Sequence, residues 1–402
     1  MKMFALQWIS YYGSGLFAGL AWLVATVWLW RILPALKMLP AVPDLCDPKY
    51  DAANMEKWPS ITVIVPAKDE ARAIESCLRS LIESDYPNFQ IVAIDDRSTD
   101  ETGALMDRMA SGASDRLRAL HVRELPEGWL GKSHAMALAA NDIQSDWVLF
   151  TDADVIFARD VLRRAVVFAT SSEADHFVLY PTLILHGWKE QMLIAFFQSV
   201  SVLAGRPWKI PDPKAKRDFI GVGAFNMIRR PVYEALGGYA ALRMEVLEDM
   251  RLGYQVKSEG YAQRVAFGKD LIRIRWAESA RGMLENLTKN LFAAFRFRTV
   301  LVLGACIGMA LMALTPFVAL AFSGADRWAG MVTLLLLLLL NLRYWKQTNI
   351  SPIYLLLFPV ATLLFLWTLL RSMLLALKRG GVLWRGTLYP LEELRRHAGL
   401  LR

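Results

Sequence analysis

The chain has 402 residues, of which 55% are hydrophobic and 21% are charged, and its formal net charge is +8. Its mean hydropathy of +0.29 is too high for an ordinary soluble protein, whereas its charged content is too high for a chain buried wholly in lipid. These values exclude both extremes and predict a soluble domain joined to membrane-spanning segments. The three cysteines, Cys46, Cys77 and Cys306, have no disulfide or metal-ligand spacing, which fits a reducing compartment.

The positive net charge does not by itself indicate a nucleic acid partner. The sequence has no zinc-finger spacing, no aromatic-basic RNA motif and no basic helical repeat. Anionic lipid headgroups and diphosphate-bearing small ligands account for the excess charge better. We therefore expect no nucleic acid to bind.

Four apolar runs are candidates for crossing a membrane, which needs about 20 predominantly apolar residues. They are Ile9–Trp30, Thr299–Phe322, Trp328–Trp345 and Ile353–Leu377. A cleaved signal peptide is the alternative for the first run. That run is too long for a typical hydrophobic signal region, and no small-residue cleavage site follows it.

The charges beside these runs predict the orientation of the chain. Arg31 and Lys37 follow the first run, and Arg296 and Arg298 precede the second, so the region between them should be cytoplasmic. Four simple spans would place the basic C-terminal tail outside, so the topology stays open. The expected domains are a membrane helix (1–35), a catalytic domain (36–280), an interfacial helix (281–298), about three membrane helices (299–378) and a basic tail (379–402).

The region between the first two runs has the pattern of an α/β domain. Ile61–Val65 predicts a buried parallel strand, Arg72–Ser84 has its apolar residues at helical spacing, and Gln90–Ile94 predicts the next strand. This order is a strand–helix–strand unit of a nucleotide-binding fold. Leu117–Val122 and Trp147–Thr151 predict further strands of the same sheet. Because neither GxGxxG nor GxxxxGKS/T is present, a dinucleotide-binding Rossmann domain and a P-loop NTPase are disfavoured.

Four short acidic clusters stand beside the ends of apolar segments, and strands that end at one edge of a sheet would bring such clusters together. The clusters are Asp69-Glu70, Asp95-Asp96, Asp152-Ala153-Asp154 and Glu248-Asp249. Carboxylates at strand ends suit a divalent metal, ribose hydroxyls and proton abstraction. The pattern therefore predicts an enzyme that acts on a nucleotide-linked substrate.

Asp95 and Asp96 end the second predicted strand, in front of residues 98–100, which can cap the following helix. Capping explains those residues but not two acids ahead of them. We expect Asp96 to accept a hydrogen bond from a nucleobase or a ribose hydroxyl. For Asp95, a nucleotide contact and a purely structural role are equal alternatives.

Asp152 and Asp154 directly follow the strand Trp147–Thr151. Two carboxylates at i and i+2 beyond a strand can face one loop, where they would hold Mg²⁺ or Mn²⁺ against a diphosphate. Such a triplet alone occurs by chance in many chains, so its place at the end of a buried strand supplies the indication. We expect both acids to bind the metal, with Asp152 also facing the nucleotide-linked substrate.

Glu248 and Asp249 open a helical segment, where acids also complement the helix dipole. We favour Asp249 as a general base that takes a proton from an acceptor hydroxyl, with Glu248 beside it in the acceptor site. The segment 221–226 is a second part of that site, because its glycines let the backbone approach closely. Gly223 and Asn226 would line the floor, and a tight structural turn is the alternative.

Lys132 follows a flexible glycine and is expected to meet a diphosphate at a helix N-terminus, with a solvated lysine as the alternative. His134 is either a polar core residue or a site residue. Gly282–Arg298 has leucines and phenylalanines at helical spacing with basic residues between them. It predicts an amphipathic helix at the membrane interface, which is compatible with packing against the soluble domain.

An ordered set of four motifs resembles a family 2 glycosyltransferase with the GT-A fold, over roughly residues 59–280. The motifs are Ile64–Glu70, Asp95–Asp100, Asp152–Asp154 and Glu248–Asp249. The resemblance implies that Asp96 contacts the nucleobase and that Glu70 contributes to nucleotide binding. It also implies that Asp154 coordinates the metal and that Asp249 is the catalytic base.

Three further segments look like the membrane-bound branch that contains hopene-associated and carotenoid glycosyltransferases, with ceramide glucosyltransferases as more distant relatives. They are Gly128–Ala135, Gly221–Arg230 and Trp384–Tyr389. This resemblance implies a lipid acceptor and a nucleotide-diphosphate sugar donor, with a UDP-sugar favoured. The QxxRW motif of processive polysaccharide synthases is not found after Asp249, and Arg275-Trp276 is only a partial echo of it.

Together these observations predict a metal-dependent, inverting hexosyltransferase of the inner or plasma membrane, with an α/β catalytic domain in the cytoplasm. It would transfer one sugar to a hydroxyl of a membrane lipid. Polyprenyl-phosphate sugar synthesis or polysaccharide synthesis is the nearest alternative. A scaffold or transporter that retains the fold is the alternative from another class, which is disfavoured because the acids cluster outside the apolar runs.

Overall fold

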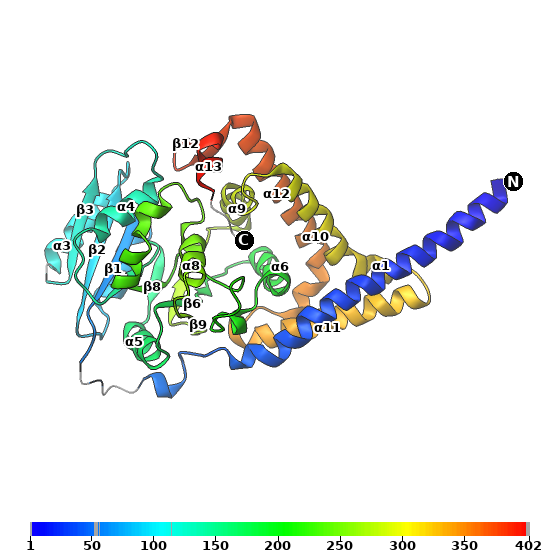
Figure 1. Cartoon of the computed structure of the whole chain (residues 1–402), viewed down its shortest axis with the longest axis horizontal. Coiled ribbons are helices and arrows are strands. Elements are labelled where there is room, and N and C mark those ends of the chain that lie inside the picture. Colours follow the sequence, from blue (N-terminus) through cyan, green and yellow to red (C-terminus); the bar gives the residue numbers. More distant parts are fainter. Residues whose placement is uncertain (1, 52–54, 56, 114, 399–402) are drawn as a thin grey trace. The chain divides into compact units, whose positions relative to one another are not determined.

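The computed structural model describes residues 2–51, 55, 57–113 and 115–398, and its contacts divide the chain into two compact units. The helical unit consists of Met1–Pro40, Leu185–Arg206 and Ser279–Leu375. The α/β unit consists of Ala41–Ile184, Pro207–Glu278 and Ala376–Arg402. Figure 1 labels many of the helices and strands of each.

The α/β unit is built on a seven-stranded sheet with the order β3-β2-β1-β4-β8-β6-β9. β1 pairs in parallel with β2 and β4, β2 with β3, and β6 with β9, whereas β8 runs antiparallel to β4 and β6. The strands are β1 (Ile61–Ala67), β2 (Phe89–Asp96), β3 (Leu117–Val122), β4 (Trp147–Phe150), β6 (His176–Leu179), β8 (Asn226–Arg229) and β9 (Gln263–Ala266). The first four confirm the predicted strands to within two residues at each end.

Helices cover this sheet because their apolar residues recur at helical spacing. α2 buries Ile74, Cys77, Leu78 and Leu81 on one face, as its sequence pattern predicts. The α-helices of the unit are α2 (Ile74–Ile82), α3 (Thr102–Gly112), α4 (Gly131–Ala140), α5 (Val161–Ser171), α7 (Arg230–Ala235), α8 (Glu248–Ser258) and α13 (Leu391–His397). Its 3₁₀ helices are η2 (Pro48–Tyr50), η3 (Pro207–Lys209) and η4 (Gly238–Leu242).

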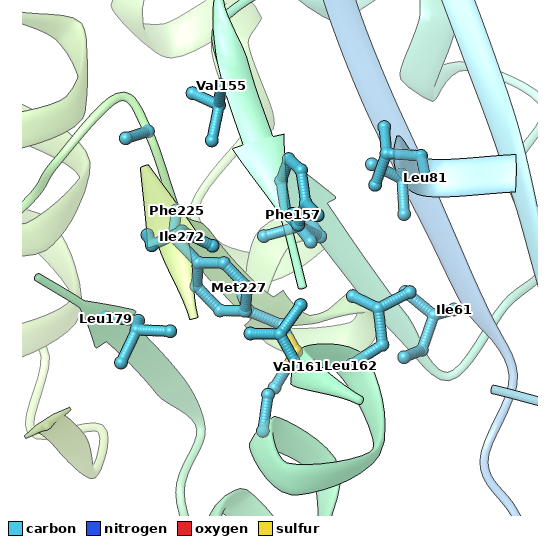
Figure 2. Packing of buried hydrophobic residues seen from close by; sticks show 14 of the residues in the cluster. Ile61, Leu81, Val155, Phe157, Val161, Leu162, Leu179, Phe225, Met227 and Ile272 are labelled. Atoms are coloured by element: carbon cyan, nitrogen blue, oxygen red, sulfur yellow. The ribbon is translucent and has the colours of Figure 1, made fainter. Parts of the chain in front are cut away.

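Hydrophobic cores lie on both faces of the sheet. Val63 and Val65 of β1 pack into one core, whereas Ile64 between them packs into the other. This explains why the strand reads as an uninterrupted apolar run rather than an alternating one. Figure 2 shows the first core, in which Phe157, Phe225 and neighbouring aliphatic side chains converge. The cores fix the strands whose ends carry the acidic clusters.

Two smaller sheets complete the α/β unit. β5 (Val155–Phe157), β10 (Ile272–Ile274) and β7 (Thr182–Leu183) form a three-stranded sheet in the order β5-β10-β7. β11 (Gly381–Trp384) and β12 (Thr387–Pro390) form an antiparallel hairpin. The hairpin belongs to the α/β unit although it follows the last apolar helix in the chain.

The other unit contains the long apolar helices. Its elements are α1 (Lys2–Met38), η1 (Leu39–Ala41, at its boundary), α6 (Trp188–Ala204), α9 (Ala280–Ala294), α10 (Thr299–Ala319), α11 (Ala325–Thr348), η5 (Pro352–Leu357) and most of α12 (Phe358–Arg379). Four stretches of the described residues are long and apolar enough to cross a membrane: Gly15–Ala41, Thr299–Ala319, Ala325–Trp345 and Pro352–Arg379. Each overlaps one of the four runs that the sequence predicts, although the first begins and ends later than the predicted Ile9–Trp30.

Polar side chains link the helices within this unit. Trp28 Nε1 donates to the Met312 carbonyl at 2.8 Å, and Asn341 Nδ2 donates to Ser199 Oγ at 3.0 Å. The second bond ties α11 to α6, which comes from the middle of the sequence. Such bonds fix the pairing of helices where apolar contacts alone discriminate poorly.

The predicted amphipathic helix is present as α9, which Ser279 caps at its start through the Gly282 N–H. It ends at Ala294, before the predicted Arg298, because Arg296 and Phe297 adopt a left-handed backbone. The contacts also place α6 with the apolar helices and Ala376–Arg402 with the α/β unit. The predicted bounds of the catalytic domain (36–280) and of the tail (379–402) follow the linear sequence, in which α6 lies inside the first and the tail stands apart. These domain assignments stay predictions.

Candidate active site

The carboxyl ends of three neighbouring parallel strands bring the first three acidic clusters to one edge of the sheet. In register, Ala67 of β1 lies beside Asp95 of β2, and Ile64 lies beside Phe150 of β4. The loops after these strands therefore start from the same edge, which is where open α/β sheets bind ligands.

Asp96 is 4% exposed and is held by its neighbour in the chain. Arg97 Nε and Nη2 donate to the two oxygens of Asp96 at 2.8 and 3.1 Å, which makes a bidentate pair. Gly131, at the start of α4, packs so closely on this pair that a Cβ there would overlap Asp96 Oδ2. Asp96 thus lies at the predicted edge, and its contact with a nucleobase stays a prediction.

Asp95 is occupied by partners from the protein. Its Oδ1 accepts from the Ser98 N–H at 3.0 Å, and its Oδ2 lies 3.3 Å from His121 Nδ1. Hydrogen bonds to Asp107 and then Asp95 raise the pKa of His121, against the effect of burial. These contacts agree with the structural alternative for Asp95, whose role in nucleotide binding stays a prediction.

Glu70 lies in a loop that the next loop holds in place. Its N–H donates to Thr102 Oγ1 at 2.8 Å, and Thr99 N–H donates to Asp69 Oδ1 at 2.7 Å. Asp69 takes a left-handed backbone at a φ of 53°, which turns the chain at this point. The Glu70 carboxylate forms an ion pair with Arg385 from the C-terminal hairpin.

Asp152 and Asp154 lie between β4 and β5, on either side of a residue that anchors them. Ala153 is 4% exposed and packs into the core, whereas both acids are partly exposed. Burial, followed by the charges of Asp152 and Glu70, raises the pKa of Asp154 to about 7. The two predicted metal ligands are therefore close enough to repel each other when both are ionised.

Lys132 connects this cluster to the fourth one. Its Nζ lies 2.7 Å from Asp152 Oδ1 and 2.7 Å from Glu248 Oε1. Burial opposes the charged form, but Asp152, Glu248 and Asp249 together raise the pKa of Lys132 well above its ordinary value. The alternative of a solvated lysine therefore does not hold, and contact with a diphosphate stays a prediction.

Glu248 and Asp249 form the first turn of α8, where the helix dipole favours negative charge. Glu248 is buried, and Asp249 Oδ1 accepts from the Met250 N–H at 2.7 Å. Burial and the charge of Glu248 raise the pKa of Asp249 to about 7, although Lys132 acts in the opposite direction. A carboxyl that titrates near neutral pH is suited to general base catalysis.

The glycine-rich segment before β8 lies against the cluster of Asp152 and against that of Asp249. A Cβ on Gly221 would overlap the Asp249 carbonyl oxygen, and a Cβ on Gly223 would lie 2.6 Å from Asp152 Oδ2. Close backbone approach, as predicted, is what these glycines permit. Asn226 is fully buried in β8 with His176 as its side-chain partner. This packing fits the structural alternative, and acceptor contacts by Gly223, Asn226 and Glu248 stay predictions.

The acids fit a metal that is completed by ligands from the substrate. Among the described residues, no three His, Cys, Asp or Glu side chains are arranged to hold a metal ion. Asp152 and Asp154 supply two carboxylates whose mutual repulsion a divalent cation would relieve. Mg²⁺ is commonly held by one or two carboxylates together with substrate phosphates. The choice between Mg²⁺ and Mn²⁺ stays open.

The positions of two residues near this edge of the sheet are hard to predict from the sequence. Tyr389 of β12 accepts a hydrogen bond from the Gly131 N–H at 3.2 Å and lies beside Arg97. Tyr389 belongs to the segment that resembles membrane-bound relatives, but nothing local to that segment indicates where it packs. His134 has its Nδ1 buried without a hydrogen-bond partner among the residues described, and burial lowers its pKa.

Comparison with known proteins shows which family this part of the chain matches. Residues 62–250 match the family model described as glycosyl transferase family 2. The chain carries a glycosyl transferase family 2 domain. The matched residues include all four acidic clusters and end directly after Asp249, so the match confirms the predicted resemblance. With the sheet and the four apolar helices, it also confirms the predicted fold class of an α/β GT-A domain with membrane segments.

Curated relatives include the 4,4'-diaponeurosporenoate glycosyltransferases of Staphylococcus aureus strains MRSA252 and USA300. Each is 24% identical to this chain over 235 residues, which cover 58% of this chain and 60% of the relative. The chain thus spans about 60% of the length of these relatives.

Among solved structures, the mannosyltransferase PcManGT from Pyrobaculum calidifontis, in complex with GDP-Man and Mn²⁺, is similar with a TM-score of 0.45. The sequences are 20% identical, and the similarity covers 90% of this chain and 98% of PcManGT. A structure of S. aureus TarS with UDP-GlcNAc is similar with a TM-score of 0.40 at 15% identity, over 80% of this chain and 92% of that one.

Proposed function

We propose that this protein is an inverting glycosyltransferase that moves one sugar from a nucleotide-diphosphate donor to a hydroxyl of a membrane lipid. The observation that supports this most is the junction at Lys132, which joins Asp152 of the proposed metal site to Glu248 at 2.7 Å each, next to Asp249. A group for binding the departing diphosphate and a base for the acceptor thus lie side by side, on a family 2 domain.

In the proposed reaction, the oxygen of the acceptor hydroxyl attacks the anomeric carbon, and Asp249 accepts the proton of that hydroxyl. The bond from that carbon to the diphosphate breaks on the opposite side, so the configuration inverts. The raised pKa of Asp249, about 7, makes its carboxylate a stronger base than an ordinary aspartate while leaving much of it ionised at neutral pH.

The departing nucleoside diphosphate gains negative charge, which this site is suited to stabilise. A divalent metal held by Asp154 and Asp152 would neutralise that charge as a Lewis acid. Lys132 would release Asp152 as its partner and contact the diphosphate at the N-terminus of α4. Asp96 and Arg97 would face the nucleoside, where a UDP-sugar is our favoured donor.

A lipid acceptor is supported by the four apolar helices, which are long enough to span a membrane. It is also supported by the relatives named 4,4'-diaponeurosporenoate glycosyltransferase. The positive flanks at Arg31, Lys37, Arg296 and Arg298 favour a catalytic domain on the cytoplasmic side of the inner or plasma membrane. Nucleotide sugars would then reach the site from the cytoplasm.

The decisive experiment compares lipids of cells with and without the active protein. Mass spectrometry of total lipids should show a product that is one hexose heavier than its acceptor and that disappears in the Asp249→Asn variant. Glu259→Gln is the matched control, because it neutralises an exposed acid just past the other end of α8. Absence of any glycosylated lipid with the wild-type protein would contradict the proposal.

The same variant separates the nearest alternatives. A polyprenyl phosphate is already an anion and needs no general base, so transfer that persists in a folded Asp249→Asn variant would favour polyprenyl-phosphate sugar synthesis. A product of many linked sugars would indicate polysaccharide synthesis. A scaffold or transporter would show no metal-dependent hydrolysis of a nucleotide sugar by the purified protein.

A further inference from the structure

The C-terminal hairpin has a tip with an unusual backbone. β11 and β12 are joined by Arg385 and Gly386, and both residues have a positive φ, at 47° and 79°. A two-residue connection with this backbone is a common hairpin turn, but its first position is usually Asn, Asp or Gly. Arginine is strained there, which suggests that its side chain has a use at that place.

The tip of the hairpin reaches the loop that carries the first acidic cluster. Arg385 Nη1 donates to the Lys68 carbonyl, and its Nη2 donates to Glu70 Oε1. Both partners lie more than 300 positions earlier in the sequence, with separations of 317 and 315. The guanidinium therefore sits at the carboxyl end of β1, within the same unit of the fold.

The second strand of the hairpin anchors it to two more loops of the same edge. The Tyr389 hydroxyl accepts from the Gly131 N–H and lies beside Arg97, and the residue is only 8% exposed. Gly131 begins the helix that carries Lys132, and Arg97 holds Asp96. The hairpin thus contacts the loops after β1 and β2 and the start of α4, which are the parts assigned to donor binding.

We propose that Arg385 is a donor-binding residue that pairs with Glu70 when the site is empty and with the diphosphate of the donor when it is filled. This inference rests on the proposed function and adds a residue from outside the family 2 domain to its donor site. In it, Tyr389 positions the hairpin, and Glu70 is the resting partner of Arg385.

The exchange follows from the chemistry of the groups. The side chains of Arg385 and Glu70 are 38% and 24% exposed, so water competes for their ion pair and makes it weak. A guanidinium presents a planar fork of donors that matches phosphate oxygens, and a diphosphate with two negative charges attracts it more strongly than one carboxylate does. When Arg385 moves to the diphosphate, Glu70 loses its positive partner, and the negative charge of Glu70 then acts on the nearby Asp154.

The test measures nucleotide binding by the purified full-length protein in lipid nanodiscs, with Mn²⁺ present. The probes are UDP, GDP and the corresponding nucleosides, titrated by calorimetry. Arg385→Gln should weaken binding of the preferred nucleoside diphosphate about tenfold or more and leave the nucleoside unaffected. The control is Arg396→Gln, which removes the same charge from the same tail at a side chain that is 75% exposed. It should bind like the wild type.

Glu70→Gln tests the exchange itself, because it removes the competing partner and keeps the shape of the side chain. It should bind the nucleoside diphosphate at least as tightly as the wild type does, because in this inference Glu70 holds Arg385 in the empty site and does not itself contact the nucleotide, which replaces the nucleotide contact that the family resemblance implies for it. In the unaltered protein, saturating UDP or GDP should slow amide hydrogen exchange in residues 381–390. That measurement needs no variant and so does not depend on whether Arg385→Gln folds.

The outcomes separate this inference from the function on which it rests. If the wild type binds a nucleoside diphosphate and Arg385→Gln binds it equally well, Arg385 is only a tether and the inference alone is wrong. If Glu70→Gln loses nucleotide binding, Glu70 itself contacts the nucleotide, and the proposed exchange of partners by Arg385 is wrong. If the wild type binds neither UDP nor GDP, the proposed function fails, and the inference fails with it.

Discussion

The acids at the edge of the sheet fall into two groups that differ in how their charge is balanced. In the first, here the paired group, each carboxylate contacts a basic side chain that no other acid of the sheet edge contacts. Its pairs are Glu70 with Arg385, Asp95 with His121, and Asp96 with Arg97. In the second, here the shared group, several carboxylates surround one amine. Its members are Asp152, Asp154, Glu248 and Asp249, with Lys132.

We expect this difference to separate the residues that recognise the donor from those that carry out the chemistry. The basic partners of the paired group balance the charge of their carboxylates, which suits these pairs to hydrogen-bond a ligand rather than to react with it. In the shared group the balance is incomplete, and the pKa values of Asp154 and Asp249 both rise to about 7. Crowded acids of this kind take up a cation or a proton readily, and these are the two events that metal-assisted glycosyl transfer requires.

The largest expected effect comes from removing a carboxylate from the shared group. Asp154→Asn should lower the rate of sugar transfer about 1,000-fold, because the metal that we propose to stabilise the leaving diphosphate would lose a ligand. This corresponds to about 4 kcal/mol of transition-state stabilisation. Initial rates over a range of Mn²⁺ concentrations would measure it.

Asp107→Asn is a suitable control for that experiment, because Asp107 is an exposed acid that contacts the paired group through His121. It should keep most of the wild-type rate and the same dependence on metal. Equal losses in the two variants would show that the shared group has no special role.

Removing the shared cation should have the second largest effect. Lys132→Met keeps the length of the side chain but leaves Glu248 buried without its ion pair, and we expect transfer to fall about thirtyfold. Lys132 lowers the pKa of Asp154 and of Asp249, so both should rise further in the variant. A pH–rate profile would show the midpoint moved upward. A fall in rate with an unmoved midpoint would mean that Lys132 binds the donor without tuning Asp249.

The strands and the acids at their ends could be predicted from the sequence because both depend on local pattern. An apolar β-branched run such as Ile61–Val65 identifies a parallel strand buried on both faces. Acids directly after such runs must then reach one edge of the sheet. Asp96, Asp152 and Asp154 were placed by this reasoning alone.

The partners of those acids could not be predicted, because they depend on packing between distant segments. Nothing near Arg385 in the sequence indicates Glu70, which precedes it by 315 positions. The same holds for Tyr389 and Gly131, separated by 258. The grouping of α6 with the apolar helices was missed for a related reason. Its composition resembles that of a core helix, and only contacts such as Asn341 to Ser199 assign it.

A change in the paired group should affect donor binding more than the rate of chemistry. Arg97→Gln breaks the bidentate pair with Asp96, and we expect the KM for the donor to rise about tenfold with kcat nearly unchanged. Steady-state kinetics with varied donor would measure this. Arg118→Gln, which removes an exposed arginine from β3, serves as the control. A fall in kcat without a change in KM would contradict the assignment of Arg97 to recognition.

The smallest expected effect is the response of the unaltered enzyme to pH. As a general base Asp249 must be ionised, and its raised pKa of about 7 means that activity is full above that pH and is lost as the pH falls through it. For a single group, kcat/KM should fall roughly fivefold between pH 7 and pH 6 and more steeply below.

The profile also distinguishes the two groups of acids, because only changes within the shared group should move its midpoint. Arg97→Gln should lower kcat/KM by the same factor at every pH, whereas Lys132→Met should shift the midpoint upward. A wild-type midpoint near pH 4, the ordinary value for a carboxyl group, would show that the crowding of Asp249 by Glu248 does not persist when substrates bind. The separation between recognition and chemistry would then have to rest on geometry alone.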